Sequence, residues 1–277
     1  MKALSFPTPR NQRSWKDDVK WSAISQPFPA MPSSTEPSAW VAGTDGFRDG
    51  WVVVLHRPRT GTTRCRTVDG VDALFDLPED PSVLGVDMVI GLPDRAVPGG
   101  RTCDQAARQL LGHPRGASVF SPPAHAVLGA ETYDEAQRRN RASSPDAPGL
   151  TKQAFHLLPK MRALAERMTP ARQDRVREVH PELAFYAMNG DAPVADSKHT
   201  DAGRAARSAL LAARGFSEIE TVTDGLSGGP VGADDVLDAH AACWTARRIH
   251  AGTAERCPSK DAAAPRNDRG LRMEIWR

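Results

Sequence analysis

Residues 40–56 read WVAGTDGFRDGWVVVLH, and this stretch decides the fold. Two apolar segments, Trp40–Thr44 and Trp51–His56, have the composition of β-strands. Between them FRDG ends in Asp49 and Gly50, a dipeptide that strongly favours a tight turn between antiparallel strands. The stretch therefore predicts a β-hairpin.

The segments that follow extend this hairpin into a sheet. Thr63–Val68 has alternating and β-branched residues and is predicted to form a third meander strand, and Val71–Leu77 is predicted to form a short helix. Val83–Ile90 is apolar on both sides, as expected for a central parallel strand that is covered on both faces. The order is thus three meander strands, a crossover helix and a parallel strand, which indicates an α/β fold with a mixed sheet.

The middle of the chain differs in character. Residues 95–172 alternate Gly- and Pro-rich loops with helical stretches, and we expect a helical insertion over the sheet. Apolar residues between 154 and 168 keep helical spacing, although Pro159 is expected to kink or restart that helix.

One more strand and two helices are predicted after the insertion. In Val176–His180 the side chains of Glu178 and His180 alternate onto one face of a strand. Helices are expected around Gly203–Arg214 and, as the final helix, from Asp234 to His250.

Bulk properties limit the class of protein. A net charge of +2 permits an anionic partner without demanding one. The four cysteines lack CxxC spacing, which argues against zinc or a disulfide framework and fits a reducing cytoplasm.

No apolar run approaches the roughly 18–20 residues of a membrane span, so no membrane partner is expected. Residues 1–38 contain six prolines and no secretory apolar core, and are expected to be a disordered tail or an over-extended start before a domain at 39–277.

Four acidic residues stand where a carboxylate needs compensation. Asp45 and Asp87 lie in apolar strand segments without a lysine or arginine in the same strands, while Asp235 and Asp238 are neighbours on one face of the last helix. Burying an unpaired carboxylate costs several kcal/mol. Because carboxylates are the ligands that Mg²⁺ and Mn²⁺ prefer, the pattern predicts a two-metal site held by these four residues.

Each of these residues also has a structural interpretation. Asp45 could be a turn residue, Asp234 could be the N-cap of the last helix, and Asp235 could favour the positive end of that helix. Asp87 has no turn nearby, and Asp238 lies a full turn inside the helix, so these two are the more informative.

A second group of candidates lies in REVHPEL. Glu178 could be another metal ligand, and His180 could assist proton transfer or orient another group. The alternative for His180 is a hydrogen bond to the backbone at the strand end. Glu182 is expected at the sheet edge or in an orienting role.

Basic residues supply candidate substrate contacts. Arg101, with Asp104 and Arg108, has the helical spacing of a surface salt-bridge set. Lys152 and Lys198 lie in loops that contain Ser or Thr near the expected site. All three candidates, Arg101, Lys152 and Lys198, could contact phosphate, or could simply belong to a solvated face.

Long collinear motifs resemble the family called domain of unknown function 429, whose members are described as predicted ribonuclease H-like nucleases. The resemblance covers about residues 40–277. Its motifs here are VAGTDGFRDGWVVV, VDMVIGLP, RTCDQAAR, SVFSPPAH, TKQAF, VREVHPELAFYAMNG, SKHTDAGR, DDVLDAHAACWTARR and GLRMEIW.

The resemblance implies a ribonuclease H-like fold and a metal-dependent nuclease that acts on nucleic acid. DVLDAHA is also similar to the DxxDALA helix of RuvC-type resolvases, which supplies two acidic ligands, although His240 replaces an apolar residue there. Two other functions stay open: an ATP-binding kinase or ATPase of the actin-like relatives of this fold, and a non-catalytic binding module.

Overall fold

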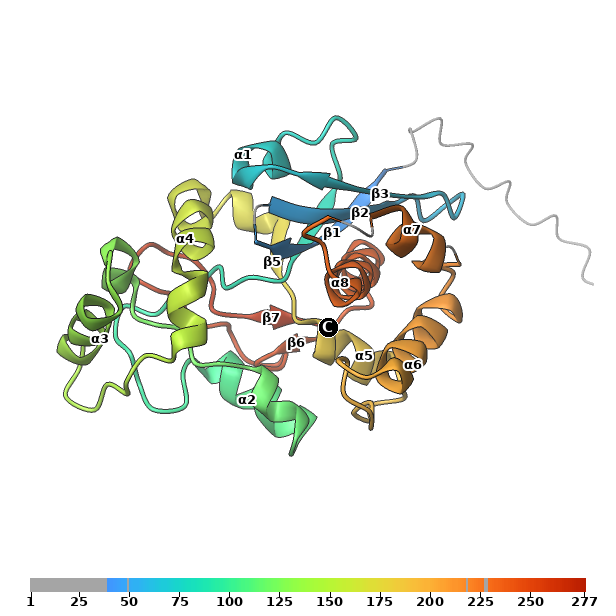
Figure 1. Cartoon of the computed structure of the whole chain (residues 1–277). Coiled ribbons are helices and arrows are strands. Elements are labelled where there is room, and N and C mark those ends of the chain that lie inside the picture. Colours follow the sequence, from blue (N-terminus) through green and yellow to red (C-terminus); the bar gives the residue numbers. More distant parts are fainter. Residues whose placement is uncertain (1–38, 49, 218, 227–228) are drawn as a thin grey trace, which may run out of the picture. The chain divides into compact units, whose positions relative to one another are not determined.

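The computed structural model describes residues 39–48, 50–217, 219–226 and 229–277. The predicted tail at residues 1–38 and Asp49 of the predicted turn lie outside the described residues. Figure 1 shows the arrangement of the elements. In chain order they are β1 (Val41–Phe47), β2 (Gly50–His56), β3 (Thr63–Val68), α1 (Gly70–Phe75), β4 (Val83–Val86), α2 (Thr102–Leu111), η1 (Arg115–Ser118), η2 (His125–Gly129), α3 (Tyr133–Ala142), α4 (Lys152–Arg167), η3 (Arg172–Asp174), β5 (Val176–Glu178), α5 (Pro181–Met188), α6 (Asp201–Ala212), α7 (Ile219–Leu226), α8 (Ala233–His250), β6 (Arg256–Cys257) and β7 (Ile275–Trp276).

A five-stranded mixed sheet in the order β3-β2-β1-β4-β5 forms the centre of the fold. Strands β1, β2 and β3 pair antiparallel, whereas β4 pairs parallel with both β1 and β5. This arrangement confirms the prediction of an α/β fold with three meander strands followed by parallel strands.

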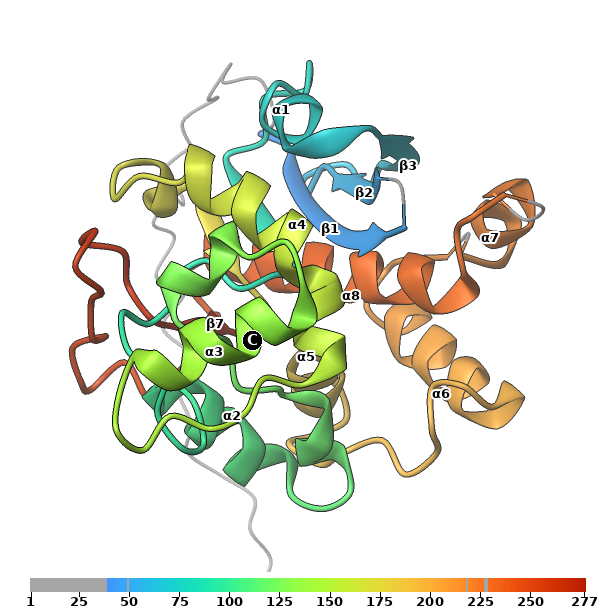
Figure 2. The same cartoon turned by 60° about the vertical axis from the view of Figure 1, so that its left-hand side comes forward.

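The two faces of the sheet pack against different helices because successive strand side chains point to opposite sides. On one face Ala42 and Leu84 pack with apolar residues of α1 and α4. On the other face Val41 and Val83 pack with apolar residues of α8. Figure 2 shows the sheet with α4 and α8 beside it.

Helix α8 lies unusually close to the two central strands. A Cβ atom at Gly43 of β1 would stand 1.8 Å from the backbone nitrogen of Cys243, and one at Gly85 of β4 would stand 2.8 Å from the carbonyl oxygen of Ala242. Only glycine leaves room for a helix backbone at this distance. The two glycines therefore set the position of α8 against β1 and β4.

Several predicted boundaries were wrong. Strand β4 ends at Val86 rather than Ile90, so Asp87 is the first residue after the strand. Of the two outcomes predicted at Pro159, a kink or a restart, the restart was wrong, because α4 is one helix from Lys152 to Arg167. Strand β5 ends at Glu178, and His180 is the N-cap of α5.

Helix α8 is the last helix of the described residues, as predicted. Residues after it form the short antiparallel pair β6–β7, and Trp276 makes a parallel bridge to Val179 just after β5. Two-residue strands carry too little pattern for prediction. In the described residues, no helix is long and apolar enough to cross a membrane.

Candidate metal centre

Two of the predicted acidic residues are brought together by the register of parallel strands β1 and β4. Thr44 pairs with Val86, and the backbone N–H of Asp87 donates to the carbonyl oxygen of Thr44 at 3.0 Å. Side chains two residues apart share a face, so Asp45 follows Gly43 on the side of α8, and Asp87 follows Gly85 there. The two carboxylates thus stand side by side. Asp45 lies within β1, so its interpretation as a turn residue was wrong.

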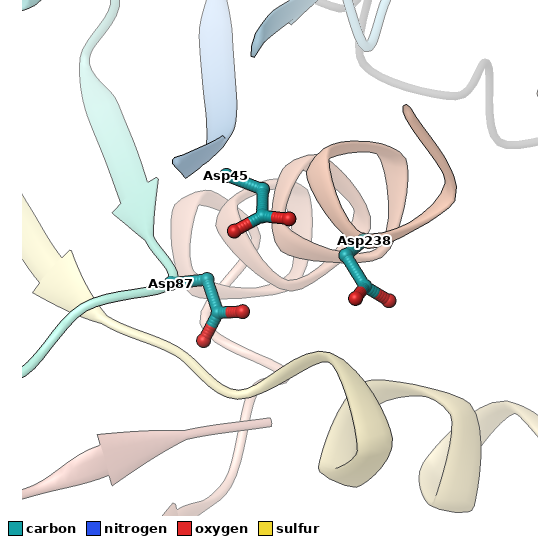
Figure 3. A group of neighbouring side chains, drawn as sticks. All are labelled: Asp45, Asp87 and Asp238. Carbon is teal, nitrogen blue, oxygen red and sulfur yellow. The ribbon is translucent and has the colours of Figure 1, made fainter. Parts of the chain in front are cut away.

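Helix α8 brings the third carboxylate to the same place. Cys243 of α8 lies over Gly43 of β1. Counted from this contact, Asp238 is five residues towards the helix N-terminus, about 7.5 Å along the helix axis, and Asp45 is two residues further along the strand, about 6.6 Å. The two side chains therefore reach about the same level. One carboxylate oxygen from each of Asp45, Asp87 and Asp238 lies within 4.8 Å of the others. Figure 3 shows the three side chains converging from the strands and the helix. This is the convergence that was predicted for these three residues.

Burial and mutual repulsion favour the protonated forms of these carboxyl groups. Burial, followed by the charges of Asp87 and Asp238, holds the pKa of Asp45 well above its usual value. Burial and the charge of Asp238 raise the pKa of Asp87 to about 8. The pKa of Asp238 is also raised by burial, although Lys198 opposes the shift. A divalent cation would relieve the same repulsion.

Few donors from the protein satisfy the cluster. Lys198 Nζ donates to Asp238 Oδ2 at 2.5 Å, and the backbone N–H of Gly46 donates to Asp45 Oδ1 at 2.7 Å. Asp238 Oδ1 is buried and has no hydrogen-bond partner among the described residues. A buried acceptor without a donor is costly, so this oxygen fits an additional cation. The carboxylate oxygens of this cluster therefore suit a hard divalent metal ion as ligands.

Asp235, the fourth predicted ligand, is oriented differently. Its Oδ2 accepts a hydrogen bond from the backbone N–H of Gly232 at 2.8 Å and caps the start of α8. Asp235 therefore interacts with the N-terminal end of its own helix, as its structural interpretation predicted. Its carboxylate is not one of the three that converge. Its charge still contributes to the raised pKa of Asp45. The N-cap is Gly232, not Asp234 as the sequence suggested.

Glu178 and Arg101 form a buried network beside the cluster. Arg101 Nη1 donates to Glu178 Oε2 at 2.9 Å, and its Nη2 donates to Asp104 Oδ1 at 2.7 Å. Glu178 Oε2 also accepts from the backbone N–H of Ile90 at 2.8 Å. Arg101 and Asp104 are buried, so the prediction of a surface salt-bridge set was wrong. Both carboxylates already have Arg101 as their partner.

His180 and Glu182 lie close to the cluster but have different partners. His180 is half-buried, and its Nε2 lies 3.4 Å from the carbonyl oxygen of Ser118, which is the kind of backbone contact that its structural alternative predicted. Its Nδ1 has no hydrogen-bond partner among the described residues. Burial lowers the pKa of this imidazole. Glu182 is buried in α5 and pairs with Arg207 at 2.7 Å, so it lies in the interior rather than at an exposed sheet edge.

A cavity of about 480 Å³ opens onto the three carboxylates. Lys198 lines it, whereas Lys152 is exposed at the start of α4 and is outside the set of described residues that line the cavity. Sequence reasoning missed Arg115 and Phe120, which reach the cavity from the insertion. No local motif marks them, because the tertiary fold alone brings their loop over the sheet.

The fold and the site define a class of protein: a mixed α/β domain with a buried carboxylate cluster that could hold a metal ion. The chain belongs to the DUF429 family, as its sequence motifs predicted: a family model described as "Protein of unknown function (DUF429)" matches residues 43–263. Comparison with curated proteins gave no match, and comparison with solved structures gave none either.

Proposed function

We propose that this domain is ribonuclease H-like and that it hydrolyses phosphodiester bonds of nucleic acid with the help of Mg²⁺ or Mn²⁺. The strand order supports the fold, since three meander strands precede parallel strands and an acidic helix packs against the centre of the sheet. The position of the three aspartates on adjacent central elements supports the activity.

The observation that carries this proposal is the convergence of Asp45, Asp87 and Asp238 with too few donors around them. A carboxylate kept for structure is normally satisfied by hydrogen bonds or an ion pair. In the described part of the chain, the three carboxylates accept hydrogen bonds from Lys198 and from the backbone N–H of Gly46, and Asp238 Oδ1 has no partner there. A site maintained at a cost to stability is typical of function.

In this proposal each group has a separate role. Asp45, Asp87 and Asp238 hold the metal, which when bound supplies activation of water and stabilisation of the leaving oxygen. Lys198 is one third exposed beside Asp238 and contacts the substrate phosphate. His180 has a lowered pKa, so its imidazole is neutral near pH 7 and accepts a proton at the unpartnered Nδ1.

A titration with Mg²⁺ and Mn²⁺ against labelled DNA and RNA tests the proposal. We expect metal-dependent cleavage by the wild type, loss of at least about 100-fold in Asp87→Asn, and no change in Asp146→Asn. Asp146 is a matched control because it is an exposed aspartate in the loop before α4. Equal cleavage by wild type and Asp87→Asn would contradict the proposal. Binding of ATP without any cleavage would favour the kinase-like alternative instead.

A further inference from the structure

The cavity beside the carboxylates has the dimensions of a small-molecule site. Its volume of about 480 Å³ falls within the range of roughly 300–1,000 Å³ that is typical of pockets for single small ligands. The carboxylates of Asp45, Asp87 and Asp238 occupy one part of its lining. The reacting phosphate would therefore be bound in a partly open pocket that is large enough for one small ligand.

The other walls of this pocket are built from segments distant in sequence. The insertion between β4 and β5 supplies Arg115, Phe120 and Leu157, and the loop before α6 supplies Lys198. Arg115 Nε donates to the carbonyl oxygen of Val194 at 3.0 Å, so the insertion is fastened to the segment that precedes this loop. The pocket is therefore lined by the insertion and by the loop before α6 as well as by the elements that carry the carboxylates.

A paired nucleotide fits such walls poorly. In a duplex each strand carries a phosphate about every 3.4 Å of helix axis, and the complementary strand fixes the direction of every base. A duplex can present a phosphate at its outer surface, but the base of that nucleotide stays in the helix interior and cannot enter the pocket together with the phosphate. An unpaired nucleotide can rotate away from its neighbours and place its base, sugar and phosphate in the pocket together.

The lining also matches the parts of one nucleotide. Phe120 is half-buried in the wall and offers a surface for a base, and the apolar side chains of Met88 and Leu157 also line the pocket. Lys198 supplies positive charge beside the carboxylates, where a phosphate would approach the metal. The pocket thus combines an apolar wall with a charged end.

We propose that the substrate of this site is a phosphodiester carried by a single unpaired nucleotide, with the base against Phe120. This inference rests on the proposed function. Hydrolysis consumes one water: a new bond forms from its oxygen to phosphorus, the bond from phosphorus to the leaving oxygen breaks, and one proton is transferred to that oxygen. The source of the nucleotide can be a single-stranded nucleic acid or a small nucleotide diester.

The test compares four substrates with the full chain and Mn²⁺: a labelled single strand, its blunt duplex, the duplex with a single-stranded overhang, and the p-nitrophenyl ester of thymidine 5′-monophosphate. We expect the single strand and the overhang to be cleaved at least about tenfold faster than the blunt duplex, with cleavage of the overhang stopping near the junction. Release of p-nitrophenol shows that the small diester is also a substrate, whereas its absence assigns the site to single-stranded nucleic acid. Equal cleavage of the blunt duplex would overturn the inference and leave the proposed function intact.

Phe120→Ala tests the position of the base. We expect it to raise KM for the single strand about tenfold, as loss of one stacked base does, with kcat less affected. Phe155→Ala is the matched control because Phe155 is a half-buried residue of the insertion that packs on Tyr133 and does not line this cavity in the described chain. An unchanged KM in Phe120→Ala would overturn the inference.

Failure of cleavage in every arm would refute the proposed function, and binding then decides the inference. Fluorescence anisotropy with labelled single strand and duplex in Ca²⁺ measures that binding without hydrolysis. Preference for the single strand that is lost in Phe120→Ala would support an unpaired nucleotide in the pocket. Equal binding of both forms, or an unaltered preference in the variant, would refute it.

Discussion

Asp87 shows at the scale of one residue how position changes chemistry. It follows a strand whose alternation turns it towards α8, and there burial and the charge of Asp238 raise its pKa from 3.8 to about 8. In the metal-free protein at pH 7 the side chain is therefore mostly protonated. An aspartate that is neutral in the folded protein at pH 7 is poised to exchange its proton for a metal ion.

Asp87→Asn should leave the metal-free fold almost unchanged at pH 7, within about 1 kcal/mol, because an amide resembles a protonated carboxyl group in shape and charge. Mn²⁺ should raise the melting temperature of the wild type and not that of the variant. Thermal melts with and without Mn²⁺ measure both effects. Destabilisation of the variant by about 1–3 kcal/mol would instead show a structural hydrogen bond. An equal metal response would remove Asp87 from the ligands.

The affinity for Mn²⁺ should depend on pH through the same group. Because the folded pKa of Asp87 is raised from 3.8 to about 8, its contribution to the stability of the metal-free fold is full below 3.8 and is lost as pH rises through 8. A metal must displace the proton, so affinity should rise with pH, by up to about tenfold per unit, and level off above pH 8. Calorimetric titrations across this range measure it. A flat profile would exclude Asp87 as a ligand that loses a proton.

Lys198→Gln should separate metal binding from catalysis. The ammonium group lies 2.5 Å from Asp238 Oδ2, so it repels a cation bound at the carboxylates. We expect the variant to bind Mn²⁺ more tightly and to cleave nucleic acid more slowly, because it lacks the phosphate contact. Calorimetry and a cleavage assay at saturating metal measure the two effects. Lys198→Arg is the control that keeps the charge, and weaker Mn²⁺ binding in Lys198→Gln would contradict this role.

At the scale of elements, the contact of α8 with β1 and β4 positions the candidate centre. Glycines at positions 43 and 85 let the helix backbone approach, and the antiparallel course of α8 places Asp238 beside the strand ends. A shift of α8 by one residue would turn Asp238 away by about 100°. The position of α8 therefore determines the geometry of the three carboxylates.

Gly43→Ala should destabilise the fold by at least about 3 kcal/mol, because the added methyl group would overlap the backbone at Cys243 and α8 would have to move. Chemical denaturation measures the change in unfolding free energy. Gly225→Ala is the matched control, since this exposed glycine of α7 has nothing within 4 Å of an added Cβ. The control should be neutral or slightly stabilising. Equal stability of both variants would show that the close contact does not hold in solution.

At the scale of the whole domain, the candidate centre joins parts that are far apart in the chain. Asp45 and Asp238 are separated by most of the folded sequence, and the insertion and the loop before α6 complete the cavity around them. A bound metal would thus act as a bridge between β1, the end of β4 and α8.

Mn²⁺ should slow hydrogen–deuterium exchange in β1, in the residues after β4 and in the first half of α8, because a bridging ion opposes local opening of these elements. Exchange in α3, none of whose described residues lines the cavity, should not change. Mass spectrometry of the wild type with and without Mn²⁺ measures this, with Asp87→Asn as the control. Uniform slowing throughout the domain would indicate non-specific stabilisation instead.

The sequence alone predicted the elements that carry strong local patterns. The turn-flanked apolar segments predicted β1 and β2, the alternating residues of Thr63–Val68 predicted β3, and the doubly apolar run predicted a parallel β4. It also marked Asp45 and Asp87, because a carboxylate in an apolar segment conflicts with its surroundings and that conflict is local, and it marked Asp238, because this residue lies a full turn inside the last helix.

Only the tertiary structure decided which polar groups pair with each other. The sequence could not show that Asp235 caps its own helix, that Glu178 is bound by Arg101, or that Lys198 reaches Asp238. It also could not place Phe120 in the wall of the cavity. The local sequence pattern reflects how buried and exposed side chains alternate along one strand or helix, and a single segment determines that alternation. Pairing depends on distances between segments, and those are fixed only when α8, the insertion and the sheet pack together.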